Sequence, residues 1–74
     1  REEVRYEQFM TEDANMLVVA FGTAARIAKG AVKRARREGL PVGLFRPITL
    51  WPFPKEELKE LSRRIHNILV FEFN

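Results

Sequence analysis

The sequence predicts an α/β domain in which a parallel sheet carries helices on both faces, a three-layer α/β/α arrangement. Apolar strand-like runs alternate with amphipathic helix-like segments in the order β-α-β-α-β. The first run, residues 16–21, is apolar without alternation, as is typical of a strand buried on both faces of a parallel sheet. Because parallel crossovers are almost always right-handed, the simplest strand order is 2-1-3, with the two helices on opposite faces.

Length and composition limit the classes of protein that the chain can represent. With 74 residues it forms one domain at most, and 46% hydrophobic and 31% charged residues indicate a globular chain. It contains no cysteine, which excludes disulfides, thiolate zinc sites and cysteine-ligated iron–sulfur clusters on this chain. No apolar run is long enough to span a membrane and no signal-peptide pattern opens the chain, so we expect a cytoplasmic protein.

Residues 1–15 show no regular hydrophobic period, and acidic residues predominate among them. We interpret them as a connecting arm on the surface, leading into a domain that spans residues 16–74. An arm without a fold of its own and a sheet of only three strands both suggest a fragment. We expect the intact protein to add strands.

Residues 24–38 have the pattern of a helix that follows a tight turn. Gly22 and Thr23 form this turn, with Thr23 as the expected N-cap, and Gly39 is suited to a left-handed C-terminal cap. Alanines recur at intervals of three and four residues and predict a narrow stripe that lets the helix lie close to the sheet: Ala24, Ala28, Ala31 and Ala35.

The second strand is predicted at residues 41–46, and a stiff loop follows it. Three prolines between positions 47 and 54 restrict the backbone of this loop, which carries Trp51 and Phe53. Burying one large apolar side chain stabilises a structure by roughly 1.5–3 kcal/mol. We therefore expect Trp51 and Phe53 to dock onto the core of this chain or onto a partner.

Pro54 is predicted to occupy the first position of the second helix, where its missing N–H is tolerated. Leu58, Leu61 and Ile65 are spaced to form one apolar face of this helix. The last strand is predicted at residues 68–73.

The carboxyl ends of the three predicted strands should lie at one edge of the sheet, where ligands bind most often. That edge would collect Gly22, Thr23, Arg46 and Glu72. A glycine turn into a helix can bind phosphate, but this one lacks the spacing of known phosphate loops, and a tight turn with a threonine cap is favoured. Arg46 and Glu72 could form an ion pair, which we favour, or reach a neighbouring domain.

Six basic residues of the first predicted helix could form a face for nucleic acid: Arg26, Lys29, Lys33, Arg34, Arg36 and Arg37. No aromatic residue is interleaved with them, so a solvated outer face is favoured and nucleic acid is not an expected partner. His66, the only histidine, lies near the end of the second helix without a partner at a catalytic or metal-binding spacing. The sequence therefore shows no catalytic constellation.

Three segments resemble the alpha subunit of 2-oxoacid:ferredoxin oxidoreductases: V-A-F-G-T-A-A-R-I-A at 19–28, E-G-L-P-V-G-L at 38–44 and R-P-I-T-L-W-P-F-P at 46–54. The closing segment L-V-F-E-F-N at 69–74 resembles the strand that precedes a Gly-Gln pair in that family. The third segment is the most specific of the four. The resemblance implies a domain similar to the C-terminal domain of transketolase, with more strands than this chain supplies.

The resemblance also implies a function for the parent enzyme, the oxidative decarboxylation of a 2-oxoacid to an acyl-coenzyme A. Such enzymes use thiamine diphosphate and magnesium and pass electrons through iron–sulfur clusters to ferredoxin. None of the family's thiamine-binding motifs falls on this chain, so the resemblance implies no cofactor and no catalytic residue here. It implies an assembly domain that contacts other domains of the alpha subunit, the beta subunit and the iron–sulfur subunits.

An assembly domain needs an interface, and the stiff loop is the part of the sequence best suited to one, because a preorganised segment loses little entropy on docking. The residues expected there are Arg46, Pro47, Thr49, Trp51, Phe53 and Glu72. Two other interpretations stay open: the corresponding domain of a 2-oxoacid dehydrogenase or transketolase-like enzyme, and a free-standing small module that binds polyanions.

Overall fold

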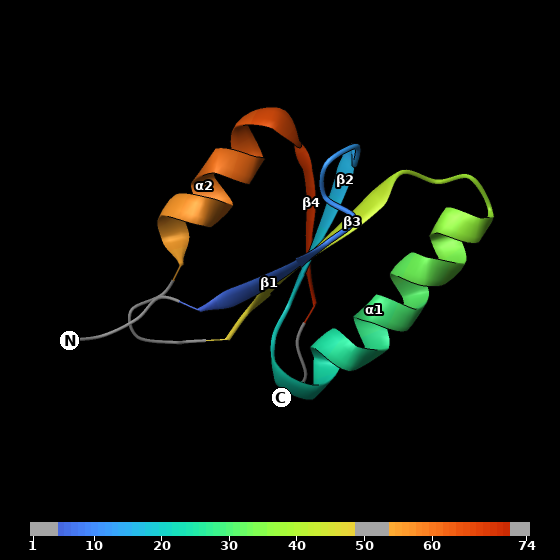
Figure 1. Ribbon diagram of the computed structural model, residues 1–74, viewed down its shortest axis with the longest axis horizontal. Helices are drawn as coiled ribbons and strands as arrows, with labels where there is room; N and C mark the ends of the chain where they lie inside the picture. Colours follow the sequence, from blue (N-terminus) through green and yellow to red (C-terminus); the bar gives the residue numbers. More distant parts are fainter. Residues whose placement is uncertain (1–4, 49–53, 72–74) are drawn as a thin grey trace.

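The computed structural model describes residues 5–48 and 54–71 of the chain. Its elements alternate between strands and helices after an initial strand pair (Figure 1). In chain order they are β1 (Tyr6–Phe9), β2 (Met16–Ala20), α1 (Gly22–Arg37), β3 (Val42–Pro47), α2 (Lys55–Arg64) and β4 (Asn67–Phe71).

The four strands form one sheet in the order β1-β3-β2-β4. β2 runs parallel to both β3 and β4, which confirms the predicted 2-1-3 order of the three expected strands. β1 pairs antiparallel with β3, from Tyr6 opposite Pro47 to Phe9 opposite Leu44, so the sheet is mixed and not wholly parallel. The interpretation of the first fifteen residues as an arm without a fold was therefore wrong for Tyr6–Phe9, whose four residues are too few to show a period by themselves.

The two helices pack on opposite faces of the sheet, as predicted (Figure 1). On the α2 face, Leu17 and Phe45 pack with Leu61 and Ile65 of the helix region. On the α1 face, a second cluster is made mostly of small residues from the helix and branched residues from the sheet: Ala20, Ala25, Ala28, Val32, Val42 and Leu44. Alternate residues of β2 and β3 serve the two clusters, because successive side chains of a strand point to opposite faces.

α1 begins earlier than predicted and its start differs from the expected cap. Phe21 is the N-cap residue and Gly22 already belongs to the helix, with φ of +55°, so the prediction of Thr23 as N-cap was wrong. The end of the helix is as predicted, since Gly39 has φ of +87°. The N–H of Gly39 bonds to the carbonyl of Arg36 and that of Leu40 to Ala35, the pattern of a Schellman cap.

The predicted alanine stripe of α1 is covered only in part. Ala24 and Ala28 are buried, whereas Ala31 is exposed and Ile27 keeps 53% of its surface accessible. Val32, at the edge of the predicted stripe, is also buried. The uncovered positions lie beside β4, the strand at the end of the sheet.

α2 begins one residue after the predicted position, and Pro54 is its N-cap residue. Its apolar face is as predicted: Leu61 and Ile65 are buried and Leu58 packs against their cluster. The part of the loop that carries Trp51 and Phe53 lies outside the described residues.

The connection between β1 and β2, residues 10–15, is held from both faces of the sheet. Arg36 of α1 donates to the carbonyls of Met10 and Val42 and to both carboxylate oxygens of Asp13, at 2.7–3.0 Å. Arg64 of α2 donates to the carbonyls of Thr11 and Glu12. This connection also lies close to β3, because a Cβ added to Gly43 would stand 2.8 Å from the carbonyl oxygen of Met10.

Candidate functional site

The sequence placed an interface on six residues, of which the structure describes two. Pro47 is buried at the end of β3, opposite Tyr6 of β1. Arg46 precedes it and is 42% exposed. The other four, Thr49, Trp51, Phe53 and Glu72, lie outside the described residues.

Arg46 belongs to a group of charges that joins β1, β3 and α1. Its Nη1 donates to Oε1 of Glu7 at 3.2 Å, and Nζ of Lys29 donates to Oε2 of the same carboxylate at 3.5 Å. We had favoured an ion pair of Arg46 with Glu72, which lies outside the described residues. Within them, the partner of Arg46 is Glu7, a residue that sequence reasoning had assigned to the arm.

These charges line a cleft of about 460 Å³ beside the carboxyl ends of β2 and β3. Arg26, Lys29 and Arg46 supply three positive charges and Glu7 one negative charge. Gly22 and Thr23, at the start of α1, line the same cleft. The sequence prediction that Gly22, Thr23 and Arg46 share one edge of the sheet is confirmed.

The cationic surroundings of Glu7 stabilise its charged form. The hydrogen bond from Arg46 is the main reason that the pKa of the Glu7 carboxyl lies below its ordinary value, and the charge and hydrogen bond of Lys29 act in the same direction. Partial desolvation opposes this lowering of the pKa without cancelling it. Glu7 is therefore a carboxylate at neutral pH and acts as the internal counter-ion of the cleft.

The basic residues of α1 were expected to form a solvated outer face. Several of them instead contact other parts of the domain. Arg36 holds residues 10–15, and its pairing with Asp13 lowers the pKa of that carboxyl. Lys29 and Lys33 lie over the ring of Phe9, with Nζ 4.9 and 6.0 Å from its centroid. Much of this positive charge therefore fastens β1 to the helix.

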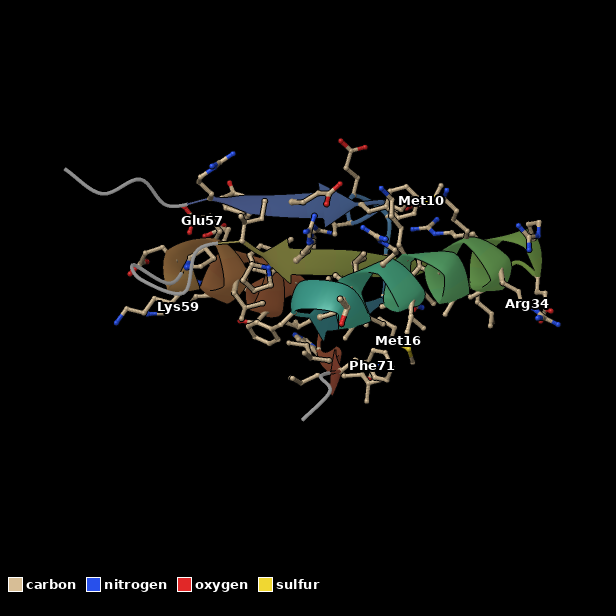
Figure 2. All side chains as sticks on the ribbon, turned by 90° about the horizontal axis from the view of Figure 1, so that it is seen from below. Met10, Met16, Arg34, Glu57, Lys59 and Phe71 are labelled. Carbon is tan, nitrogen blue, oxygen red and sulfur yellow. The ribbon has the colours of Figure 1, made fainter. Side chains whose placement is uncertain are left out.

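The opposite edge of the sheet has a different character. β4 exposes consecutive apolar side chains, with 41% of Ile68, 57% of Leu69 and 58% of Val70 accessible. β2 pairs with one side of β4, and no strand among residues 5–48 and 54–71 pairs with the other side. Figure 2 shows β1 and β4 at opposite ends of the sheet, with Phe71 at the β4 end.

A shallow apolar groove of about 180 Å³ runs between β4 and α1. Its walls come from the exposed part of the helix stripe and from two strands, and all lining residues are apolar: Val18, Ile27, Ala28, Ala31, Leu69 and Phe71. The groove explains why the predicted helix stripe was covered only in part. Ile27 and Ala31 lie beside β4, the last strand of the described sheet, and no further described strand covers them.

Sequence reasoning did not identify this edge, although a signal was present. Residues 68–71 form an apolar run without alternation, the same pattern that indicated burial on both faces for residues 16–21. Applied to the last strand, the same rule predicts further cover that residues 5–48 and 54–71 do not provide. Glu7, by contrast, gave no signal, because its partners are 22 and 39 positions away in the sequence.

Among the described residues, no three His, Cys, Asp or Glu side chains are grouped so that they could hold a metal ion. Neither α1 nor α2 has the length and apolar character needed to cross a membrane. His66 is exposed just beyond the end of α2.

Comparison with known proteins gives a consistent family. The family described as pyruvate:ferredoxin oxidoreductase core domain II matches residues 14–74. The chain is 57% identical over 60 residues to ketoisovalerate oxidoreductase subunit VorB of Methanothermobacter marburgensis, covering 81% of this chain and 17% of that protein. It is 39% identical over 64 residues to 2-oxoglutarate synthase subunit KorA of the same organism, covering 86% of this chain and 17% of that protein.

A third relative matches the chain from end to end. Pyruvate synthase subunit PorA of Pyrococcus furiosus is 32% identical over 74 residues, which is 100% of this chain and 19% of that protein. The chain thus spans less than a fifth of the length of these curated relatives.

Proposed function

This chain belongs to the family of pyruvate:ferredoxin oxidoreductase core domain II, found in the alpha subunits of 2-oxoacid:ferredoxin oxidoreductases, and from this membership we propose that it is a noncatalytic assembly domain of such a subunit. The parent enzyme would decarboxylate a 2-oxoacid oxidatively to an acyl-coenzyme A in the cytoplasm and pass the electrons to ferredoxin. The domain would hold neighbouring parts of the enzyme in position.

The apolar β4 edge is the observation that carries this proposal. A strand with three neighbouring exposed apolar residues and no second partner strand among the described residues is a strong template for further pairing, and proteins normally protect such edges. Each large apolar side chain that becomes covered there contributes roughly 1.5–3 kcal/mol. We propose that other parts of the alpha subunit cover β4 and extend the sheet to one similar to the C-terminal domain of transketolase.

The names of the relatives support a role for this domain other than recognition of the 2-oxoacid. They refer to ketoisovalerate, 2-oxoglutarate and pyruvate, yet all three proteins share this domain with the present chain. A domain that chose the 2-oxoacid would be expected to differ in its chemistry among them. We therefore propose that the substrate binds outside this domain.

Magnesium and iron–sulfur clusters find no fitting ligands among the described residues. The donor set of the described residues offers no acidic or histidine cluster for magnesium, and the chain has no cysteine for an iron–sulfur cluster. We propose that thiamine diphosphate, magnesium, coenzyme A and the clusters are held by other domains, by the beta subunit and by the iron–sulfur subunits. We also propose that Arg46, Pro47, Thr49, Trp51, Phe53 and Glu72 form a second contact with these partners.

Substitution of Leu69 by aspartate in the alpha subunit tests the proposal. A charge in the buried contact should reduce the fraction of assembled enzyme, measured by native mass spectrometry, while the activity per assembled complex stays normal. Leu40→Asp is the matched control, because Leu40 is 51% exposed in the connection between α1 and β3. Normal assembly of Leu69→Asp, or normal assembly with lost activity, would contradict a noncatalytic assembly role.

A similar experiment tests the stiff loop. Trp51→Ala should weaken association of the alpha subunit with its partners more than it lowers the subunit's own free energy of unfolding, because aromatic anchors dominate interfaces. Association equal to that of the unchanged subunit would remove Trp51 from the proposed contact.

A further inference from the structure

The cleft between β1, β3 and α1 is lined by more cationic than anionic side chains among the described residues. Among residues 5–48 and 54–71, Glu7 is the only acidic residue that lines it, and this single carboxylate contacts both Lys29 and Arg46. Arg26 lines the same cleft and is exposed. Three cations against one carboxylate leave a net charge of about +2 in a concave space, where a field is stronger than on a flat surface.

The geometry of the cleft adds a second kind of donor. Gly22 and Thr23 line it at the amino end of α1, and the residue before the helix, Phe21, has no polar side chain to cap this end. The first turn of α1 also contains no acidic residue. The amino end of α1, where backbone N–H groups carry partial positive charge, therefore borders the same space as the cationic side chains.

We propose that this cleft binds the phosphate or pyrophosphate group of a small molecule, with Arg26, Lys29 and Arg46 as its cationic ligands. The site is distinct from the β4 edge and independent of the assembly role. Its volume of about 460 Å³ lies within the range of small-molecule pockets and exceeds what one phosphate needs. The ligand would therefore carry a further group beyond the phosphate.

Phosphate fits this donor set better than a single carboxylate does. A phosphate carries two negative charges near neutral pH and several acceptor oxygens, so that it can match a net charge of +2 and accept from two guanidinium groups together. A carboxylate carries only one negative charge, and the carboxylate of Glu7 already places one such charge against Lys29 and Arg46. Glu7 keeps Lys29 and Arg46 in place in the empty cleft and competes with an incoming anion.

This competition predicts that removing the acidic residue and removing a basic residue change the affinity for an anion in opposite directions. Glu7→Gln removes the competing charge, so it should tighten binding of inorganic pyrophosphate about fivefold, whereas Arg46→Gln and Arg26→Gln should each weaken it about fivefold. The matched control is Arg37→Gln, which removes the same charge from the far end of α1. Its affinity should equal that of the unchanged chain.

The measurement is an NMR titration of the alpha subunit that contains this domain with pyrophosphate at constant ionic strength, followed at the amides of Gly22 and Thr23. Acetate in place of pyrophosphate should give at least tenfold weaker binding. Equal binding of acetate, equal weakening by Arg37→Gln, or the absence of saturable shifts at these amides would each overturn the proposal. If Arg46→Gln unfolds the chain, Arg26→Gln decides, because Arg26 is exposed and its loss leaves the Glu7 contacts intact.

Discussion

The two edge strands of the sheet differ in almost every physical property. β1 alternates accessible and half-buried residues, and its central Glu7 is joined to β3 by Arg46 and to α1 by Lys29. β4 presents Ile68, Leu69 and Val70 to solvent in succession. One edge of the sheet is thus fastened by charges from within the chain, whereas the other carries apolar surface that the described part of the chain leaves exposed.

The difference shows which part of the domain is complete by itself. A charged residue on an edge strand discourages pairing with another chain, and β1 has Glu7. Exposed apolar residues invite such pairing, and β4 has them together with the groove beside α1. From this contrast we infer that β1 is an outer edge of the parent subunit and β4 an inner one.

The largest expected effect comes from replacing a leucine by alanine once in β3 and once in β4. Leu44 is 1% exposed and lies opposite Phe9 of β1, so Leu44→Ala should lower the free energy of unfolding of the isolated chain by about 2–5 kcal/mol. Leu69→Ala, at a side chain 57% exposed, should change it by less than about 1 kcal/mol. Urea denaturation measures both. Similar losses would mean that β4 is as well packed as β3.

A pair of glycines tests how closely β3 packs against residues 10–15. A Cβ at Gly43 would stand 2.8 Å from the Met10 carbonyl oxygen and 2.9 Å from Cα of Thr11, so Gly43→Ala should destabilise the chain by about 1–3 kcal/mol. Gly30, within α1, has no atom within 4 Å of such a Cβ, and Gly30→Ala should stabilise the chain by about 0.5–1 kcal/mol. Thermal unfolding gives both values. A neutral Gly43→Ala would show that this contact can relax.

The ion pairs of the β1 edge predict a smaller effect that depends on pH. Hydrogen bonding to Arg46 holds the pKa of Glu7 below its ordinary value of 4.5 in the folded chain. The stability that Glu7 contributes is therefore complete above pH 4.5 and is lost as the pH falls through the lowered pKa. Glu7→Gln should reduce stability at neutral pH and flatten the decline in acid.

Denaturation at several pH values between 2 and 7 would measure this decline. Part of it should persist in Glu7→Gln, because the pKa of Asp13 is lowered as well, by hydrogen bonds from Arg36. A Glu7→Gln chain with the same acid dependence as the unchanged chain would show that the contacts with Arg46 and Lys29 contribute nothing to folding.

The sequence was sufficient for the parts of the fold that rest on local pattern. The unbroken apolar run before Gly22 and the apolar spacing of Leu61 and Ile65 led to the correct strand order and to helices on opposite faces. Gly39 was identified as a left-handed cap because few other residues tolerate that backbone conformation. Each of these signals lies within a few residues of the structure that it determines.

The parts that were missed depend on contacts between distant residues. β1 exists because β3 provides its partner, and its four residues carry no period of their own. The charged cleft brings Glu7 to Lys29 and Arg46 across 22 and 39 positions, which no local pattern indicates. Ala31 was expected to be covered because helical spacing shows which residues share a face, but not where the sheet beneath that face ends.

Hydrogen exchange at β4 tests the central claim most directly. The measurement compares the backbone amides of Ile68, Leu69 and Val70 in the isolated 74-residue chain and in the assembled alpha subunit, with the β2 amides as the internal reference. We predict that those β4 amides not bonded to β2 exchange rapidly in the isolated chain and become strongly protected in the subunit, because another strand covers them. Equally rapid exchange in both would contradict the claim that β4 is an inner edge.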